Sequence, residues 1–87
     1  MLRYPIVLVE EDDGRFSVEV PDLPGCFTYG RTYRHALKMA EEAIEGFIEV
    51  LKEDGDSIPK PSKLDVVVRK KSKPKENQIF TTIKVAA

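Results

Sequence analysis

Residues 15–37 read RFSVEVPDLPGCFTYGRTYRHAL, and within this stretch the chain changes from a strand pattern to a helix pattern. Phe16, Val18 and Val20 alternate with polar residues, which is the period of a half-buried strand. Residues 21–25 supply two prolines and a glycine, the composition of a connector, and residues 26–30 predict another short strand. From Thr32 onward the apolar period becomes helical. The stretch therefore predicts two neighbouring strands that lead directly into a helix.

The helical pattern continues well beyond this stretch. One apolar face repeats at spacings of 4, 3, 4, 3 and 4, through Tyr33, Leu37, Ala40, Ile44, Phe47 and Leu51. Thr32 is a suitable N-cap, and Gly55 is a suitable residue just past the C-terminal end. The sequence predicts one helix of about 22 residues, long enough to cover a sheet face.

Strand patterns also lie on both sides of this core. Residues 2–10 are apolar on both faces, which predicts a central strand, and Asp13-Gly14 predicts a hairpin turn after it. Residues 56–62 have an extended, proline-rich pattern, residues 64–69 predict a fourth strand parallel to the first, and residues 79–85 predict a fifth. We therefore expect an α+β fold of β-β-β-α-β order, with a mixed sheet, one long helix on one face and an extra C-terminal strand. Residues 1–69 would form the domain, and residues 70–87 a basic connector and that strand.

The length of the chain favours self-association. A domain of 87 residues buries a modest fraction of its surface, so we expect a homo-dimer or homo-tetramer. The strand without an obvious place in the sheet is our expected oligomerisation segment, namely Ile79, Phe80, Thr81, Ile83 and Val85. No apolar run is long enough for a membrane span, and the first ten residues lack the pattern of a signal peptide. We expect a cytoplasmic protein.

The charge is divided unevenly along the chain. Residues 1–57 carry 13 acidic and 6 basic side chains, whereas residues 58–87 carry 2 acidic and 8 basic ones. An acidic body suits a basic protein partner, and the glutamates Glu41, Glu45 and Glu49 on the predicted helix are the candidate partner surface. The basic residues Arg69, Lys70, Lys71 and Lys73 are a weaker candidate for nucleic-acid contact, because no aromatic residue is interleaved with them.

The sequence offers little chemistry for catalysis. His35 has no nearby serine, cysteine or aspartate placed for a relay, and the single Cys26 has the character of a buried structural thiol. Asp12 and Asp13 belong to the turn, since adjacent turn residues point apart and a cation site needs several converging oxygens. We expect no catalytic residue, no metal and no cofactor, and therefore no enzyme.

Several short sequence motifs of this chain occur together in one known family. They are Tyr4-Pro5-Ile6-Val7, the run Pro21-Asp22-Leu23-Pro24-Gly25-Cys26, Gly30 and Thr32 before the helix, the helix register Ala36-Leu37, Ala40 and Ala43-Ile44, and Asp54-Gly55 followed by Ile58-Pro59 and Pro61-Ser62. In this combination the chain resembles the HicB-like antitoxins over roughly Tyr4 to Ser62. The resemblance implies a partial RNase H-like fold and a role in binding and neutralising HicA, a small basic RNA-cleaving toxin. It does not imply RNase H activity, because the metal-binding carboxylates of that mechanism do not converge here.

Members of this family usually continue into a DNA-binding module. Only 18 residues follow Arg69, too few for a helical DNA reader, so we expect that module to be absent and leave DNA binding open. Our main hypothesis is a non-enzymatic antitoxin module that binds a HicA-type toxin. The alternatives are an oligomeric protein-interaction domain with some other partner, or weak nucleic-acid binding through the basic connector.

Overall fold

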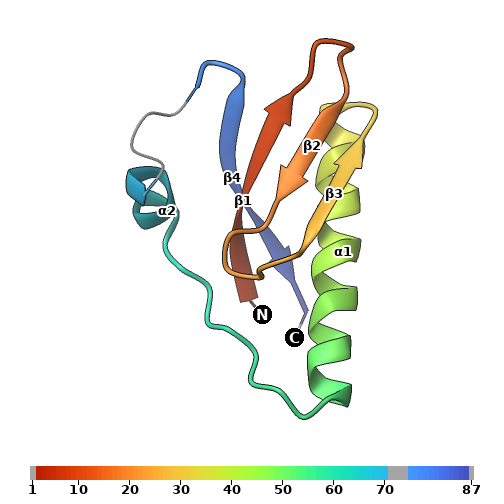
Figure 1. The fold of residues 1–87 in the computed structure, drawn as a ribbon, viewed down its shortest axis with the longest axis vertical. Helices are drawn as coiled ribbons and strands as arrows, with labels where there is room; N and C mark the ends of the chain where they lie inside the picture. Colours follow the sequence, from red (N-terminus) through yellow and green to blue (C-terminus); the bar gives the residue numbers. More distant parts are fainter. Residues whose placement is uncertain (1, 71–74, 87) are drawn as a thin grey trace.

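The computed structural model describes residues 2–70 and 75–86. The chain forms β1 (Leu2–Glu10), β2 (Phe16–Glu19), β3 (Phe27–Gly30), α1 (Tyr33–Glu53), α2 (Leu64–Lys70) and β4 (Gln78–Val85), as Figure 1 shows. The four strands form one sheet of order β3-β2-β1-β4, in which every neighbouring pair is antiparallel. The predicted α+β class, the central position of β1 and the single long helix are confirmed.

The hairpin and the helix form where the sequence predicts them. Gly14 adopts a φ of +88° in the β1–β2 turn, where its N–H donates to the carbonyl of Glu11 at 2.9 Å. The Thr32 hydroxyl caps α1 by accepting the N–H of His35 at 3.0 Å. At the other end of α1, Gly55 has a φ of +75°, the left-handed conformation that commonly ends a helix.

Two predictions about the second half of the chain are wrong. Residues 64–69, predicted as a parallel strand, form most of α2, and β4 takes the place beside β1 in antiparallel register, from Leu2 opposite Val85 to Val9 opposite Gln78. The sheet is therefore purely antiparallel. Residues Val66–Val68 have the local preference of a strand, but they cannot pair with β1 because β4 occupies that edge. Asp65 and Arg69 in turn suit the N-terminal and C-terminal ends of a short helix. The predicted β-β-β-α-β order is therefore completed by β4, and not by residues 64–69.

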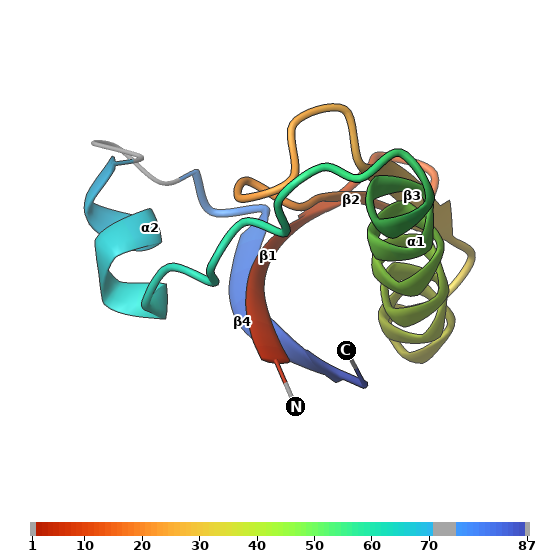
Figure 2. The ribbon, with the colours of Figure 1, turned by 90° about the horizontal axis from the view of Figure 1, so that it is seen from below.

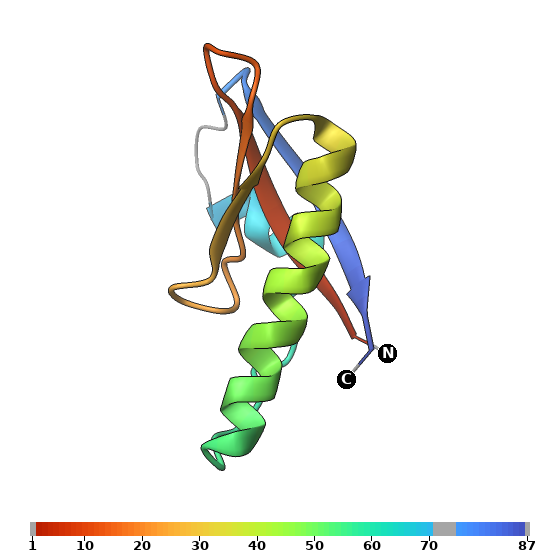
Figure 3. The ribbon, with the colours of Figure 1, turned by 90° about the vertical axis from the view of Figure 1, so that its right-hand side faces the viewer.

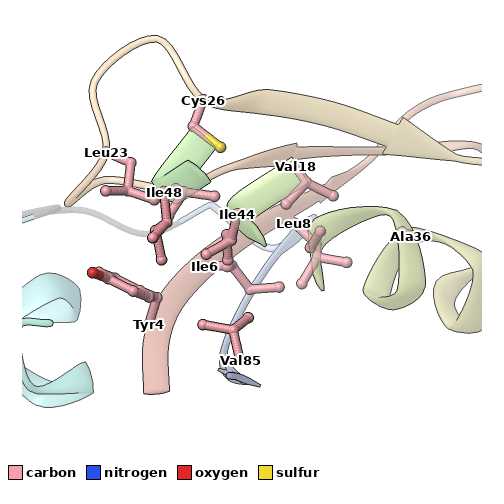
Figure 4. Packing of buried hydrophobic residues seen from close by; sticks show 12 residues of the cluster. Tyr4, Ile6, Leu8, Val18, Leu23, Cys26, Ala36, Ile44, Ile48 and Val85 are labelled. Atoms are coloured by element: carbon pink, nitrogen blue, oxygen red, sulfur yellow. The ribbon is translucent and has the colours of Figure 1, made fainter. Parts of the chain in front are cut away.

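The core lies between the concave face of the sheet and α1. Tyr4, Ile6 and Leu8 of β1 alternate toward the helix, and Ala36, Ala40, Ile44 and Ile48 of α1 meet them at helical spacing. Val18, Leu23, Cys26 and Val85 belong to the same cluster, most of which is labelled in Figure 4. The small helix α2 lies on the opposite side of β1 and β4 from α1, as the view in Figure 2 makes clear, and it contacts β4.

Gly30 sets the distance between β3 and the start of α1. A Cβ atom at this position would lie 2.3 Å from the backbone nitrogen of Ala36, so no side chain fits there. This close approach places β3 alongside α1, which Figure 3 shows from the side of the helix. The helix thus lies most closely against β3.

Candidate interaction surfaces

The predicted acidic surface lies on one flank of α1. Glu41, Glu45 and Glu49 are all exposed, and their spacing of four residues places them along the same side of the helix. Within the part of the chain that the structure describes, none of the three carboxylates forms an ion pair with Lys or Arg. They are therefore available to a basic partner.

The opposite flank of α1 is apolar, which was not predicted from the sequence. Phe27 and Tyr29 of β3 are 65% and 63% exposed, and Val50 of α1 is 54% exposed. A groove of about 310 Å³ lies between Phe27 and Val50, and the small residues Ala43 and Gly46 also line it. We call Phe27, Tyr29, Ala43, Gly46 and Val50 the β3-side strip. The sequence shows that Phe27 and Tyr29 alternate with Thr28 and Gly30, but only the contact of Gly30 with α1 shows that Phe27 and Tyr29 face away from the helix.

A strap of residues 56–63 connects α1 to α2 and is fixed at two points. The Tyr4 hydroxyl donates to the carbonyl of Pro59 at 2.6 Å. The Asp22 carboxylate accepts the N–H of Ser62 at 2.7 Å and its hydroxyl at 2.6 Å. Burial, and secondarily the Asp22 charge, raises the pKa of Tyr4 above its ordinary value. These hydrogen bonds explain why residues 21–26 and residues 59–62 both belong to the combination of motifs found in the sequence, because they hold the two segments next to each other.

The predicted oligomerisation strand has a place inside the domain. β4 pairs with β1 along its whole length, with Ile79 opposite Leu8 and Ile83 opposite Tyr4, so both face α1. Val85 is almost completely buried in the same core. Thr81 shares this face, whereas Phe80 lies on the other face of the sheet. The expectation that this strand has no place in the sheet is wrong, because β4 pairs with β1. A role of β4 in assembly stays a prediction, and it would involve the edge of β4 that does not pair with β1.

The predicted basic cluster is only partly within the described residues. Arg69 and Lys70 are exposed at the end of α2, and Arg69 pairs with Asp65 at 3.0 Å. Lys71 and Lys73 lie outside the described residues. Of these four cations, the structure describes Arg69 and Lys70.

The chemically reactive side chains occupy structural positions. Cys26 is buried, and burial raises the pKa of its thiol, which lowers its thiolate fraction. The Nδ1 atom of His35 accepts the N–H of Arg31, which lies just before α1, at 3.0 Å. Asp13 forms a 2.7 Å ion pair with Arg15, and hydrogen bonds from this arginine hold the pKa of Asp13 below its usual range. Residues 2–70 and 75–86 contain no cluster of metal-ligating side chains.

The surfaces of this domain are suited to protein contact. A curved antiparallel sheet with one long helix presents an acidic helix flank on one side and an apolar strip on the other, and no described helix has the length and hydrophobicity that crossing a membrane requires. The arrangement is that of a small α+β domain with two contrasting exposed surfaces.

Comparison with known proteins identifies the family. The model of the HicB_like antitoxin of bacterial toxin-antitoxin systems matches residues 4–87, so the chain belongs to the HicB-like antitoxins. A UPF0150 protein of Thermoplasma acidophilum is 39% identical over 67 residues, which cover 77% of this chain and 97% of that protein. The predicted resemblance is confirmed.

Solved structures of this family share the fold. The N-terminal domain of the Burkholderia pseudomallei antitoxin HicB aligns with a TM-score of 0.84 and 29% identity, covering 99% of this chain and 100% of that one. A chain of the HicA3 and HicB3 toxin-antitoxin complex aligns with a TM-score of 0.77 and 30% identity, covering 99% and 100%. The matching parts of the HicB antitoxins of Photorhabdus laumondii and Escherichia coli make up less than half of those proteins.

Proposed function

We propose that this chain is a non-enzymatic antitoxin module that binds and neutralises a small basic toxin of the HicA type. The observation that carries the proposal is membership of an antitoxin family across residues 4–87, together with the same fold in a toxin-antitoxin complex. The acidic character of residues 1–57 is an independent argument, since complementary charge steers two proteins together and fixes their orientation.

The acidic flank of α1 is our proposed toxin contact. Glu41, Glu45 and Glu49 project from a rigid helix of 21 residues, and no cation in the described chain neutralises them. A row of three carboxylates on such a helix matches a row of lysines or arginines better than three charges on a loop would, because the helix keeps their spacing fixed.

The toxin can be sought directly. We expect affinity purification of this protein from its own organism, followed by native mass spectrometry, to recover a small basic chain that cleaves RNA when free and not when bound. A complex whose partner retains full RNA cleavage, or a preparation in which the chain has no such partner, contradicts the proposal.

The surface is tested by neutralising it. Glu41→Gln, Glu45→Gln and Glu49→Gln together should slow association with the toxin about tenfold or more at low salt, with a smaller effect at high salt. The control changes three exposed carboxylates at the hairpin end, as Glu10→Gln, Asp12→Asn and Glu76→Gln, and removes the same charge from a different place. Equal effects of the two triple variants would assign the attraction to net charge and not to α1.

A further inference from the structure

Gly46 is an unfavourable residue for its position in the interior of α1. Glycine is among the residues that least favour a helix, and Gly46 has the ordinary negative φ that any residue adopts there. A Cβ atom at Gly46 would meet no heavy atom of another described element within 4 Å, whereas a Cβ atom at Gly30 would overlap Ala36. Packing within residues 2–70 and 75–86 therefore gives no reason for glycine at position 46.

The missing side chain opens the groove of the β3-side strip. No charged residue lines this groove, although 33% of the whole chain is charged, and Phe27 and Val50 form its exposed apolar walls. The lining residues of α1 run from Ala43 to Leu51, which is about 12 Å along the helix axis, or two turns. This length accommodates the side chains that a partner helix presents on successive turns.

A row of carboxylates borders the groove along α1. Glu42 and Glu49 lie four and three positions from Gly46 and are therefore its neighbours on the helix surface. Glu53 has the same relation to Val50. All three glutamates are exposed, and within the described part of the chain none forms an ion pair with Lys or Arg. Glu49 also belongs to the acidic flank, so the groove and the proposed toxin contact are continuous.

We propose that the groove receives a basic amphipathic helix of the toxin. Its apolar side chains enter between Phe27 and Val50, and its lysines or arginines face the carboxylates that border the groove. An apolar stripe with cations beside it is the surface that matches an apolar groove with carboxylates beside it. The inference rests on the proposed function, because it takes the toxin as the partner, and it adds the structural element by which the toxin is held.

The small residues of the groove favour a helix as its occupant. The distance between two packed helices depends on the side chains at their contact, and Ala43 and Gly46 are three positions apart on this side of α1. A partner helix can therefore approach α1 closely and reach Phe27. A second copy of the chain matches this groove poorly, because a two-fold contact here would bring the two rows of carboxylates together.

A designed peptide tests the groove apart from the toxin. The probe is a peptide of about 18 residues whose leucines form one helical face and whose other positions are lysine and alanine. A peptide of the same composition with its leucines dispersed around the helix should bind at least about 10-fold more weakly. Gly46→Leu, which fills the groove, should weaken binding of the first peptide by about 30-fold or more, and Gly46→Ala by less than about fivefold.

Thermal unfolding separates loss of binding from loss of folding. Alanine and leucine both favour a helix over glycine, so Gly46→Ala and Gly46→Leu should each raise the melting temperature by about 4–8 °C. Equal peptide binding by the parent and Gly46→Leu, or equal binding of the two peptides, overturns the proposal. A Gly46→Leu chain that loses self-association and still binds the peptide assigns the groove to a second copy, which also overturns it.

The toxin complex distinguishes this proposal from the proposed function. Gly46→Leu should weaken toxin binding in parallel with peptide binding, and Glu42→Gln with Glu53→Gln should weaken it at low salt. Glu10→Gln with Glu76→Gln removes the same charge at the hairpin end and is the matched control. A parent chain that binds no toxin contradicts both proposals. A toxin that binds Gly46→Leu as tightly as the parent overturns only the proposal for the groove.

Discussion

The clasp between Asp22 and Ser62 permits a quantitative prediction of stability. Asp22 accepts two hydrogen bonds from Ser62, at 2.7 and 2.6 Å, in a half-buried position. Hydrogen bonds to a charged group contribute about 1.5–3 kcal/mol each when buried, and the lower value suits this partly exposed site. Asp22→Ala should therefore lower the free energy of unfolding by about 2–3 kcal/mol. Ser62→Ala removes only the hydroxyl bond and should cost about 1 kcal/mol.

Urea unfolding of four chains measures these values: the parent, each single variant and the double variant. Because both changes act on one contact, the double variant should be little worse than Asp22→Ala alone, with a coupling energy of about 1 kcal/mol. The melting temperature of Asp22→Ala should fall by roughly 8–24 °C. Asp12→Ala, at an exposed turn, is the control. Equal stability of Asp22→Ala and Asp12→Ala, or strictly additive effects of the two clasp changes, would refute the reasoning.

Three further predictions concern single positions. Tyr4 has a raised pKa, so the stability that its neutral form provides is complete below about pH 10, the unfolded value, and is lost as the pH rises through the folded pKa. Tyr4→Phe should remove this alkaline loss and cost about 1 kcal/mol at neutral pH through the missing bond to Pro59, which urea unfolding at two pH values measures. Gly30→Ala should cost about 3 kcal/mol or more, because its Cβ would overlap the backbone of Ala36; a change under 1 kcal/mol in thermal unfolding would show that β3 can move away from α1. Cys26 should react with a thiol reagent at least 100-fold more slowly in the folded chain than in urea, and equal rates would contradict its burial.

The sequence predicts those parts of the fold that depend on neighbouring residues. Thr32 and Gly55 bound α1 because capping acts within one helical turn, and Gly14 makes its turn for an equally local reason. The alternation in residues 16–20 determines the face that Val18 presents to the core. These local signals need no knowledge of distant contacts.

The remaining parts depend on contacts between distant residues. Val66–Val68 have the composition of a strand, and they become helical because β4 takes the place beside β1. The clasp joins Asp22 and Ser62, which are 40 positions apart in the sequence, so no local sequence pattern predicts it. The position of Glu41, Glu45 and Glu49 on one exposed flank could be predicted, whereas the apolar flank beside β3 required knowledge of which sheet edge the helix covers.

The pairing of the first strand with the last has a consequence during synthesis. β1 leaves the ribosome first, and its partners in β4 follow 69 to 83 residues later. At about 5–20 residues per second, roughly 3–17 s pass between the synthesis of β1 and that of its partner residues in β4. Until then the nascent chain exposes an apolar strand edge next to Ile6 and Leu8, which is a target for chaperones. A premature stop codon within β4 would therefore remove the strand that pairs with β1, and the shortened chain would be unable to fold.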